Sequence, residues 1–330
     1  MPRALITDIA GSRISASERS FLRAFDPLGI ILFRRNIVDP AQVSELVASF
    51  RDIVGRDEAP VMIDQEGGRV ARLGEPHWWP GLPPATIARG GGRAAWLAGR
   101  LLAHDMAPLG IDVTCAPSLD LRLAGMDDVI GDRAFSHDPD RVSELGAAFI
   151  DGLGAGGVQA TIKHMPGHGR VTVDPHDSLP RVDTALAVLR EQDFIPFRRL
   201  SACPFGMVPH VVYTVVDNRN PASASPAVVR RIIRGELGFA GVLLSDAIDM
   251  GALSGPHDAR ARSCIAAGVD VVMHCNQTLE VRERVAAATP ELAGSALERV
   301  TNAAATRRPP QSGFDPCGAR AELTRLVTTS

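Results

Sequence analysis

Short apolar runs alternate with longer amphipathic segments along nearly the whole chain. The runs are mostly apolar on both faces and often β-branched, which is typical of parallel strands that are covered on both sides. They predict eight strands, at residues 4–9, 29–33, 60–63, 111–116, 158–162, 205–208, 241–244 and 269–273.

The segments between these runs have the pattern of amphipathic helices. The clearest one begins after Asp39 and Pro40, which together suit a helix N-cap and first turn. Eight strand-and-helix units in succession favour a closed (β/α)8 barrel of the TIM type over an open, doubly wound sheet. The helices are predicted at residues 41–54, 93–106, 139–153, 226–234, 258–267 and 279–288.

The chain is predicted to form one α/β catalytic domain over residues 1–330. Its length of 330 residues would also suit two medium-sized domains, so this prediction depends on the repeated strand-and-helix pattern. After about residue 305 the chain becomes rich in proline, glycine and polar residues. We therefore expect an irregular tail there, followed by a short last helix near residues 321–327.

Composition excludes some partners and suggests a compartment. The net charge of -3 gives no reason to expect nucleic acid or an anionic membrane as a partner. No apolar stretch approaches the roughly 18 residues of a membrane span, and the first residues lack the pattern of a signal peptide. The five cysteines are scattered and form no CxxC pair. We therefore expect a monomer in the reducing cytoplasm.

Polar residues follow four of the predicted strands at the point where each strand ends. Asp64 follows the third strand, and Lys163 and His164 follow the fifth. His210 and Asp246 come after the next two strands. Each of them alone could be an ordinary polar group at a strand end. Because the carboxyl ends of barrel strands converge, the four together predict an active site at that end.

Two other patterns have simpler explanations than the chemistry they suggest. Residues 152–157 satisfy GxGxxG, but here a helix precedes the glycines and a strand follows them, the reverse of a dinucleotide site. Trp78 and Trp79 lie among prolines. They could form a platform on which a sugar stacks, or a hydrophobic plug on a long loop.

Three histidines, His164, His168 and His176, could be read as a metal cluster. Pro166 and Gly167 break any helix that would align the first two, and no HExxH pattern exists. We therefore predict no metal and no cofactor.

Three segments are more specific than these patterns. They read IDQEGGRVARL at residues 63–73, IKHMPGHGRVTVDPHDSLP at residues 162–180 and GVLLSDAIDMGAL at residues 241–253. They resemble the signature blocks of glycoside hydrolase family 3, and the second block points to its single-domain bacterial β-N-acetylglucosaminidases of the NagZ type. The resemblance runs from about residue 4 to about residue 290 and implies a β/α barrel.

The resemblance implies a retaining double displacement with Asp246 as the nucleophile. A carboxylate at the end of a strand can form the glycosyl ester that water later hydrolyses. In the NagZ type the acid/base group is a histidine held by an aspartate two residues earlier, and these positions fall on His176 and Asp174. Pro175 stands where the family usually has serine or threonine, which stiffens this loop and removes an N–H.

The family also holds the terminal sugar through polar residues at strand ends. Carboxylates accept hydrogen bonds from sugar hydroxyls, and arginine, lysine and histidine supply donors. Arg72 could instead be a surface arginine, and Arg133 could pair with Asp132 or Asp128. By motif position the sugar-binding residues are Asp64, Arg72, Arg133, Lys163 and His164.

The reaction implied by the resemblance is removal of a terminal β-linked N-acetylglucosamine from the non-reducing end of a small carbohydrate. With a cytoplasmic location it suggests anhydromuropeptides as substrates, in peptidoglycan recycling. A phosphorylase or a β-glucosidase of the same family are alternatives with related chemistry. A metal-dependent barrel hydrolase and a non-catalytic sugar-binding protein are alternatives of other kinds.

Overall fold

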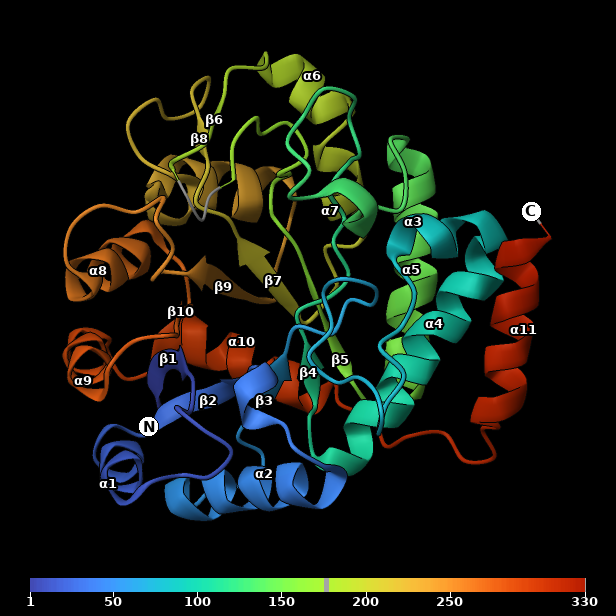
Figure 1. Ribbon diagram of the computed structural model, residues 1–330. Helices are drawn as coiled ribbons and strands as arrows, with labels where there is room; N and C mark the ends of the chain where they lie inside the picture. The colour runs from blue at the N-terminus through green and yellow to red at the C-terminus, as the bar shows by residue number, and fades with distance from the viewer. Residues whose placement is uncertain (175–177, 330) are drawn as a thin grey trace.

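The protein is described by a computed structural model that covers residues 1–174 and 178–329. Eight parallel strands close into a barrel in which β10 returns to pair with β1 (Figure 1). The prediction of a TIM-like (β/α)8 barrel is therefore confirmed. The barrel strands are β1 Arg3–Thr7, β2 Pro27–Leu32, β3 Val61–Ile63, β4 Val113–Thr114, β5 Gln159–Ile162, β7 Phe205–Val208, β9 Val242–Ala247 and β10 Val271–His274.

Helices surround this barrel, and each predicted helix is present with ends shifted by a few residues. The predicted segment 226–234 is a π-helix, η6 Ala227–Glu236, rather than an α-helix. The α-helices are α1 Ala16–Phe25, α2 Pro40–Val54, α3 Pro84–Ile87, α4 Gly91–Met106, α5 Pro139–Ala155, α6 Leu186–Glu191, α7 Phe194–Arg199, α8 His257–Ala267, α9 Leu279–Ala288, α10 Gly294–Ala305 and α11 Pro316–Thr328.

The last helix is longer than the sequence predicts. Asp315 caps it through the N–H of Cys317, and Pro316 occupies its first turn. Figure 1 shows α11 packed along the outside of α4, away from the barrel. A two-stranded parallel sheet of β6 Arg181–Val182 and β8 Val212–Tyr213 was also not predicted.

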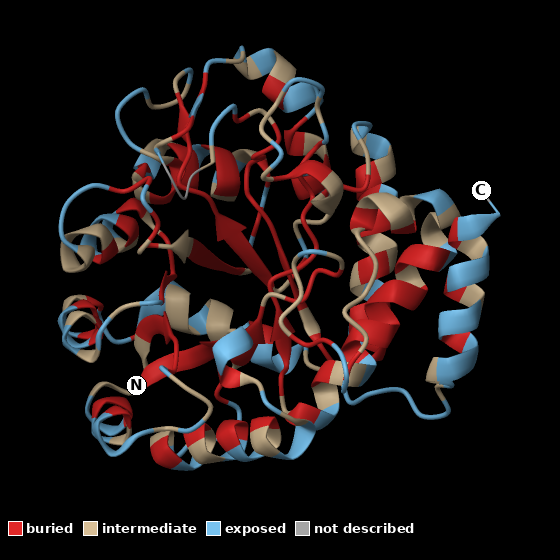
Figure 2. Cartoon of the chain, in the orientation of Figure 1, coloured by how far each residue is buried: buried red, intermediate tan, exposed pale blue. Residues whose placement is uncertain are grey.

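The alternation of side chains along each strand separates two apolar layers. In β9, for example, Val242 and Leu244 belong to the cluster inside the barrel, whereas Leu243 belongs to the layer between strands and helices. Figure 2 shows that the strands are almost entirely buried. The amino-terminal end of the barrel is closed by Leu292 and by Ala303 of α10, which join the inner cluster.

The same alternation decides which polar residues point into the barrel. Asp246 follows Val242 and Leu244 at steps of two, and Asp64 follows Met62, which also lies inside. Ile162 faces the helices, so the next residue, Lys163, points to the opposite side of the strand. These three side chains are therefore directed to the inside at the carboxyl ends of β9, β3 and β5. Within the described residues, no helix has the length and apolarity needed to cross a membrane.

Candidate active site

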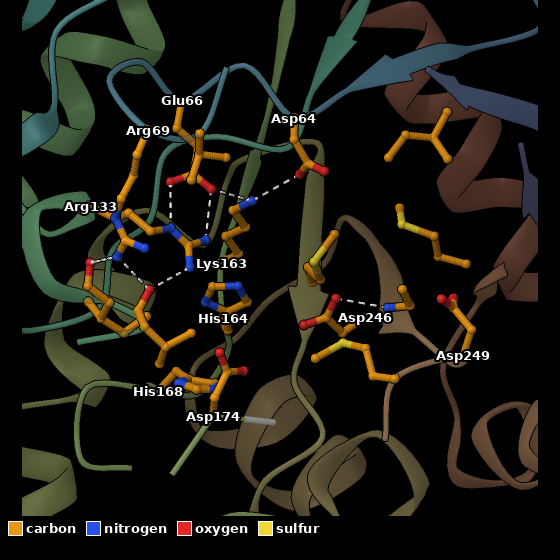
Figure 3. Close-up of a pocket in the computed structure, with 18 of the residues that line it drawn as sticks. Asp64, Glu66, Arg69, Arg133, Lys163, His164, His168, Asp174, Asp246 and Asp249 are labelled. Atoms are coloured by element: carbon orange, nitrogen blue, oxygen red, sulfur yellow. Dashed lines mark hydrogen bonds and ion pairs between the residues drawn. The ribbon is translucent and has the colours of Figure 1, made fainter. Parts of the chain in front are cut away.

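A cavity of about 680 Å³ lies at the carboxyl ends of the strands (Figure 3). The predicted acid/base residue His176 lies outside the described residues. The other seven predicted site residues all line this cavity, namely Asp64, Arg72, Arg133, Lys163, His164, Asp174 and Asp246.

Asp246 is the last residue but one of β9, at the carboxyl end of the strand. Its Oδ1 accepts a hydrogen bond of 2.8 Å from the N–H of Ala247. This bond fixes the carboxylate while leaving the other oxygen, Oδ2, without a hydrogen bond to the described residues. A carboxylate held in this way at a cavity wall is suited to nucleophilic attack.

Asp64 lies between two cationic side chains. Its Oδ1 accepts a hydrogen bond of 3.2 Å from Lys163 Nζ, and its Oδ2 accepts one of 3.1 Å from Arg72. Since 19% of the Asp64 side chain remains exposed, its oxygens can still accept hydrogen bonds from a ligand.

Glu66 links Lys163 to Arg133, and the sequence did not reveal this role. Arg133, at the end of the short helix η4 Gly131–Arg133, binds both carboxylate oxygens of Glu66 at 2.9 and 2.8 Å. Lys163 Nζ lies 2.6 Å from Glu66 Oε1. Arg133 therefore pairs with Glu66 and not with Asp128 or Asp132. Glu66 comes two residues after Asp64 and therefore points to the same, inward side. This spacing in the sequence could have identified Glu66 as a second carboxylate of the site.

His164 lines the cavity, and a buried carboxylate lies behind it. Its Nδ1 is 2.7 Å from Asp120 Oδ2. Asp120 follows β4 in the chain and does not line the cavity. Nothing in the sequence around Asp120 marked it, because its relation to His164 depends on the pairing of β4 with β5.

Two weaker expectations have clear outcomes. His210 was expected to face the cavity, and this is wrong. The residue lies two positions after Val208 of β7, which faces the helices. His210 is fully buried, and its ring nitrogens bond Ser223 Oγ and the carbonyl of Ala247.

Trp78 is buried in the core, and neither it nor Trp79 lines the cavity, which supports the hydrophobic-plug interpretation.

Comparison with known proteins identifies the family. Residues 4–307 match the sequence model of the glycosyl hydrolase family 3 N terminal domain. The chain belongs to glycoside hydrolase family 3. It is therefore a glycoside hydrolase.

Named relatives agree with this assignment. The chain is 39% identical over 309 residues to a Beta-hexosaminidase of Pseudomonas aeruginosa, covering 91% of this chain and 88% of the relative. It is 38% identical over 330 residues to a Beta-hexosaminidase of Chromobacterium violaceum, covering 93% and 88%. Among solved structures, NagZ from Neisseria gonorrhoeae in complex with N-trifluoroacetyl-D-glucosamine superposes with a TM-score of 0.87 at 30% identity, covering 99% of both chains.

The charges in this family 3 site are arranged so that Asp246 stays ionised. Burial favours a higher pKa for Asp246, but nearby His164 and His210, the N–H of Ala247 and Lys163 together lower it. Burial also opposes the charge of Glu66, but Arg133 and Lys163 hold the pKa of that carboxyl well below its usual value. Burial favours a lower pKa for Lys163, yet Glu66 and Asp64 outweigh it and raise the pKa, so the ammonium stays charged.

Residues 1–174 and 178–329 contain no group of three or more histidine, cysteine or acidic side chains arranged to hold an ion. In the same part of the chain, the ring nitrogen Nδ1 of His164 already bonds Asp120.

The one lysine of the sequence lies in this site. The chain contains 35 lysine and arginine residues in total, and only Lys163 is a lysine. Its side chain is 4% exposed and lies between two carboxylates. The compact ammonium of lysine fits between Asp64 and Glu66. The guanidinium of arginine is longer and planar, so it cannot occupy the same space between the two carboxylates.

We therefore expect Lys163→Arg to be a damaging exchange. The larger side chain should displace Asp64 and Arg133, lowering kcat/KM for an aryl β-N-acetylglucosaminide about 100-fold. Arg51→Lys is the matched control, because Arg51 pairs with the buried Asp112 away from the cavity. That variant should lower the melting temperature but keep kcat/KM within a few-fold. Equal kinetic losses in the two variants would contradict a specific role for the ammonium.

Proposed function

We propose that this family 3 glycosidase is a retaining exo-β-N-acetylglucosaminidase. The observation that carries the proposal is the meeting of Asp246 with Asp64, Arg133, Lys163 and His164 in one cavity. A nucleophile beside a set of fixed hydrogen-bond donors and acceptors suits the binding of a single terminal sugar. The similarity to proteins named Beta-hexosaminidase supports the choice of an N-acetylated sugar.

In the proposed mechanism, Asp246 attacks the anomeric carbon of the terminal sugar while the leaving oxygen takes a proton from His176. The carbon–oxygen bond to the leaving group breaks as the ester to Asp246 forms. His176 then removes a proton from water, and the water oxygen displaces Asp246 with a second inversion. Asp174 lines the same cavity and is proposed to orient the His176 ring.

The remaining polar residues would bind the sugar hydroxyls. Asp64 accepts hydrogen bonds, while Arg72, Arg133 and Lys163 donate them, and His164 contributes its ring nitrogen Nε2. Because Glu66 holds Arg133 and Lys163 in place before the ligand arrives, little conformational freedom is lost on binding.

The finer part of the proposal concerns substrate and place. We propose that the natural substrates are N-acetylglucosaminyl-anhydromuropeptides and that the enzyme acts as a monomer in the cytoplasm during peptidoglycan recycling. The similarity to NagZ of Neisseria gonorrhoeae supports this choice.

The test is a pair of aryl β-glycosides that share one leaving group and differ only at carbon 2. We expect kcat/KM for the N-acetylglucosaminide to exceed that for the glucoside by at least about 100-fold. The glucoside lacks the acetamido group, so polar groups of the site that bind this group would be left without a hydrogen-bond partner. Each assay is repeated with phosphate, and the product should remain the free sugar. Comparable values would place the protein among the β-glucosidases, and a sugar phosphate as product would make it a phosphorylase. An Asp246→Asn preparation controls for contaminating activity.

A further inference from the structure

Asp120 is a fully buried carboxylate that lies directly behind the cavity. Only 1% of it is exposed, and it does not line the cavity itself. It follows β4, while His164 follows the neighbouring strand β5. Charged side chains are rarely buried to this extent unless they are fully paired, so its partners need explaining.

Asp120 uses both oxygens as hydrogen-bond acceptors. Oδ2 lies 2.7 Å from His164 Nδ1 and accepts a bond of 2.9 Å from Ser118 Oγ. Oδ1 accepts a bond of 2.6 Å from the N–H of His168. The N–H of His164 lies within 3.3 Å of both oxygens. Asp120 therefore holds the backbone and the ring of His164 at the same time.

The carboxylate also determines where the ring carries its proton. Burial favours a higher pKa for Asp120, but His164, His168 and the hydrogen bonds that they make to the carboxylate lower the pKa to about 2. An ionised carboxylate can only accept hydrogen bonds, so His164 Nδ1 must carry a hydrogen. The other ring nitrogen, Nε2, has no hydrogen bond to the described residues and belongs to a side chain that lines the cavity.

We propose that Asp120 is a positioning residue of the glycosidase reaction, which fixes His164 with its proton on Nδ1 so that Nε2 is presented to the terminal sugar beside Asp246. This inference rests on the proposed function, because it assigns a task to a residue that acts only through a sugar-binding side chain. Figure 3 shows the ring of His164 next to Lys163 and beside Asp246, on the wall of the cavity that both of them line.

The hydrogen-bond pattern makes Asp120→Asn a sharp test. The N–H of His168 requires an acceptor at the position of Oδ1, so the amide oxygen of asparagine must occupy that position. The amide NH2 then faces His164 Nδ1 and donates to it. The ring proton must therefore move to Nε2, while the shape of the side chain is almost unchanged.

We expect Asp120→Asn to lower kcat/KM for aryl β-N-acetylglucosaminides about 10- to 100-fold, by analogy with the carboxylates that orient metal-binding histidines. The loss should be the same for good and poor leaving groups, because His164 contacts the sugar and not the leaving group. Asp112→Asn is the control, since Asp112 is equally buried and pairs with arginines at the other end of the barrel. It should affect the melting temperature without a comparable kinetic loss.

Two further measurements separate positioning from general damage. Long-range proton–nitrogen spectra of the protein labelled on its nine histidines report which ring nitrogen is protonated. His164 is assigned from the signal that disappears in His164→Gln. The protonated nitrogen should be Nδ1 in the wild type and Nε2 in Asp120→Asn. In the His164→Gln background, Asp120→Asn should cause little additional loss of kcat/KM.

The inference is overturned if the ring keeps its proton on Nδ1 in Asp120→Asn, if this variant loses no more activity than Asp112→Asn, or if the two losses add fully in the double variant. These failures differ from a failure of the proposed function. In that case the wild type itself would show no preference for N-acetylglucosaminides, whatever the state of His164.

Discussion

Replacing Asp246 with asparagine should abolish turnover of an aryl β-N-acetylglucosaminide, with a loss of about 10,000-fold or more in kcat. An amide cannot form the glycosyl ester through which the proposed reaction passes. The fold should survive, because the asparagine oxygen can still accept the hydrogen bond from the N–H of Ala247. Initial rates and thermal unfolding, measured on the same preparations, check both parts of this expectation.

Asp249→Asn is the matched control for this variant. Asp249 lines the same cavity three residues further along and accepts hydrogen bonds from the N–H of Cys275 and from Asn276. Its loss should lower kcat less than about tenfold, since an amide oxygen can still accept one of these bonds. A larger loss in Asp249→Asn than in Asp246→Asn would reverse the assignment of the nucleophile.

Removing the imidazole of His176 should have the second largest effect, and its size should depend on the leaving group. A sugar is a poor leaving group that needs a proton, so His176→Ala should lower kcat/KM for a disaccharide about 1,000-fold. An activated aryloxide departs with little protonation, so glycosylation of Asp246 should be affected much less. Deglycosylation should still slow, because no base activates the water, and the covalent intermediate should accumulate.

Asp174→Ala should act in the same direction but more weakly, since it leaves the imidazole in place. Measuring kcat/KM across a series of leaving groups, together with a pre-steady-state burst, tests both variants. Equal losses for aryl and disaccharide substrates without a burst would mean that another group supplies the proton. Asp249 would then be the first candidate, because burial raises the pKa of its carboxyl and it lines the cavity.

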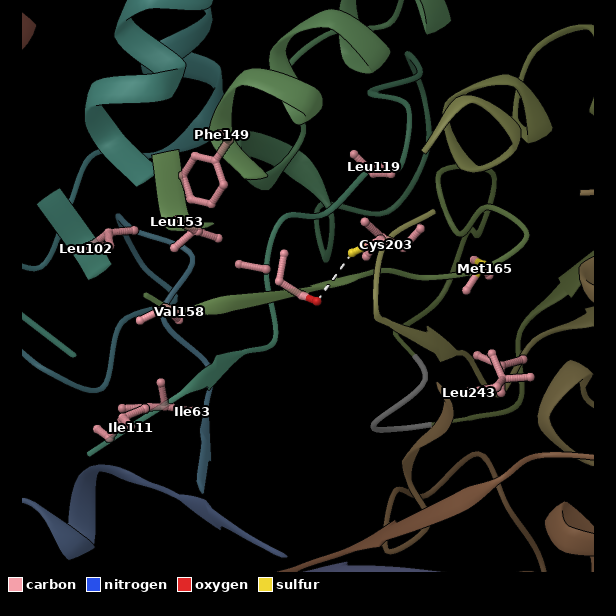
Figure 4. Packing of buried hydrophobic residues seen from close by; sticks show 14 of the residues in the cluster. Ile63, Leu102, Ile111, Leu119, Phe149, Leu153, Val158, Met165, Cys203 and Leu243 are labelled. Carbon is pink, nitrogen blue, oxygen red and sulfur yellow. Dashed lines mark hydrogen bonds between the residues drawn. The ribbon is translucent and has the colours of Figure 1, made fainter. Parts of the chain in front are cut away.

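The sequence predicted the barrel because its strands are apolar on both faces. Figure 4 shows the outer of the two layers that this pattern creates, where Ile63 of β3 and Val158, just before β5, belong to the same cluster as Leu102 and Phe149 from helices. Periodicity of this kind depends on local sequence alone, so all eight strands could be located.

Several elements outside the strand-and-helix units were missed. Helix α1 has few buried apolar residues, yet Ser15 and Glu18 form a capping box at its start, and that S-x-x-E pattern could have predicted it. The strands β6 and β8 contain two residues each and lie outside the barrel, and neither was predicted. The position of α10 beneath the barrel depends on tertiary packing and not on its own sequence.

The predicted site residues came from strand ends and motif positions, and both are local features. The residues that hold them in place are not local. Asp120 meets His164 only because β4 and β5 are neighbours, and Glu66 meets Arg133 only because the loop before η4 folds over β3. The importance of Glu66 and Asp120 follows from their hydrogen-bond partners, since a buried carboxylate must be paired.

Identification of the residue that carries the covalent sugar tests the central proposal most directly. The wild type is incubated with a slow fluorinated β-N-acetylglucosaminide, digested, and sequenced by tandem mass spectrometry. We predict that the added mass lies on Asp246, near the carboxyl end of β9, and that Asp246→Asn acquires none. A sugar attached to any other residue, or complete turnover of the wild type with no covalent adduct at any time, would contradict the proposed double displacement.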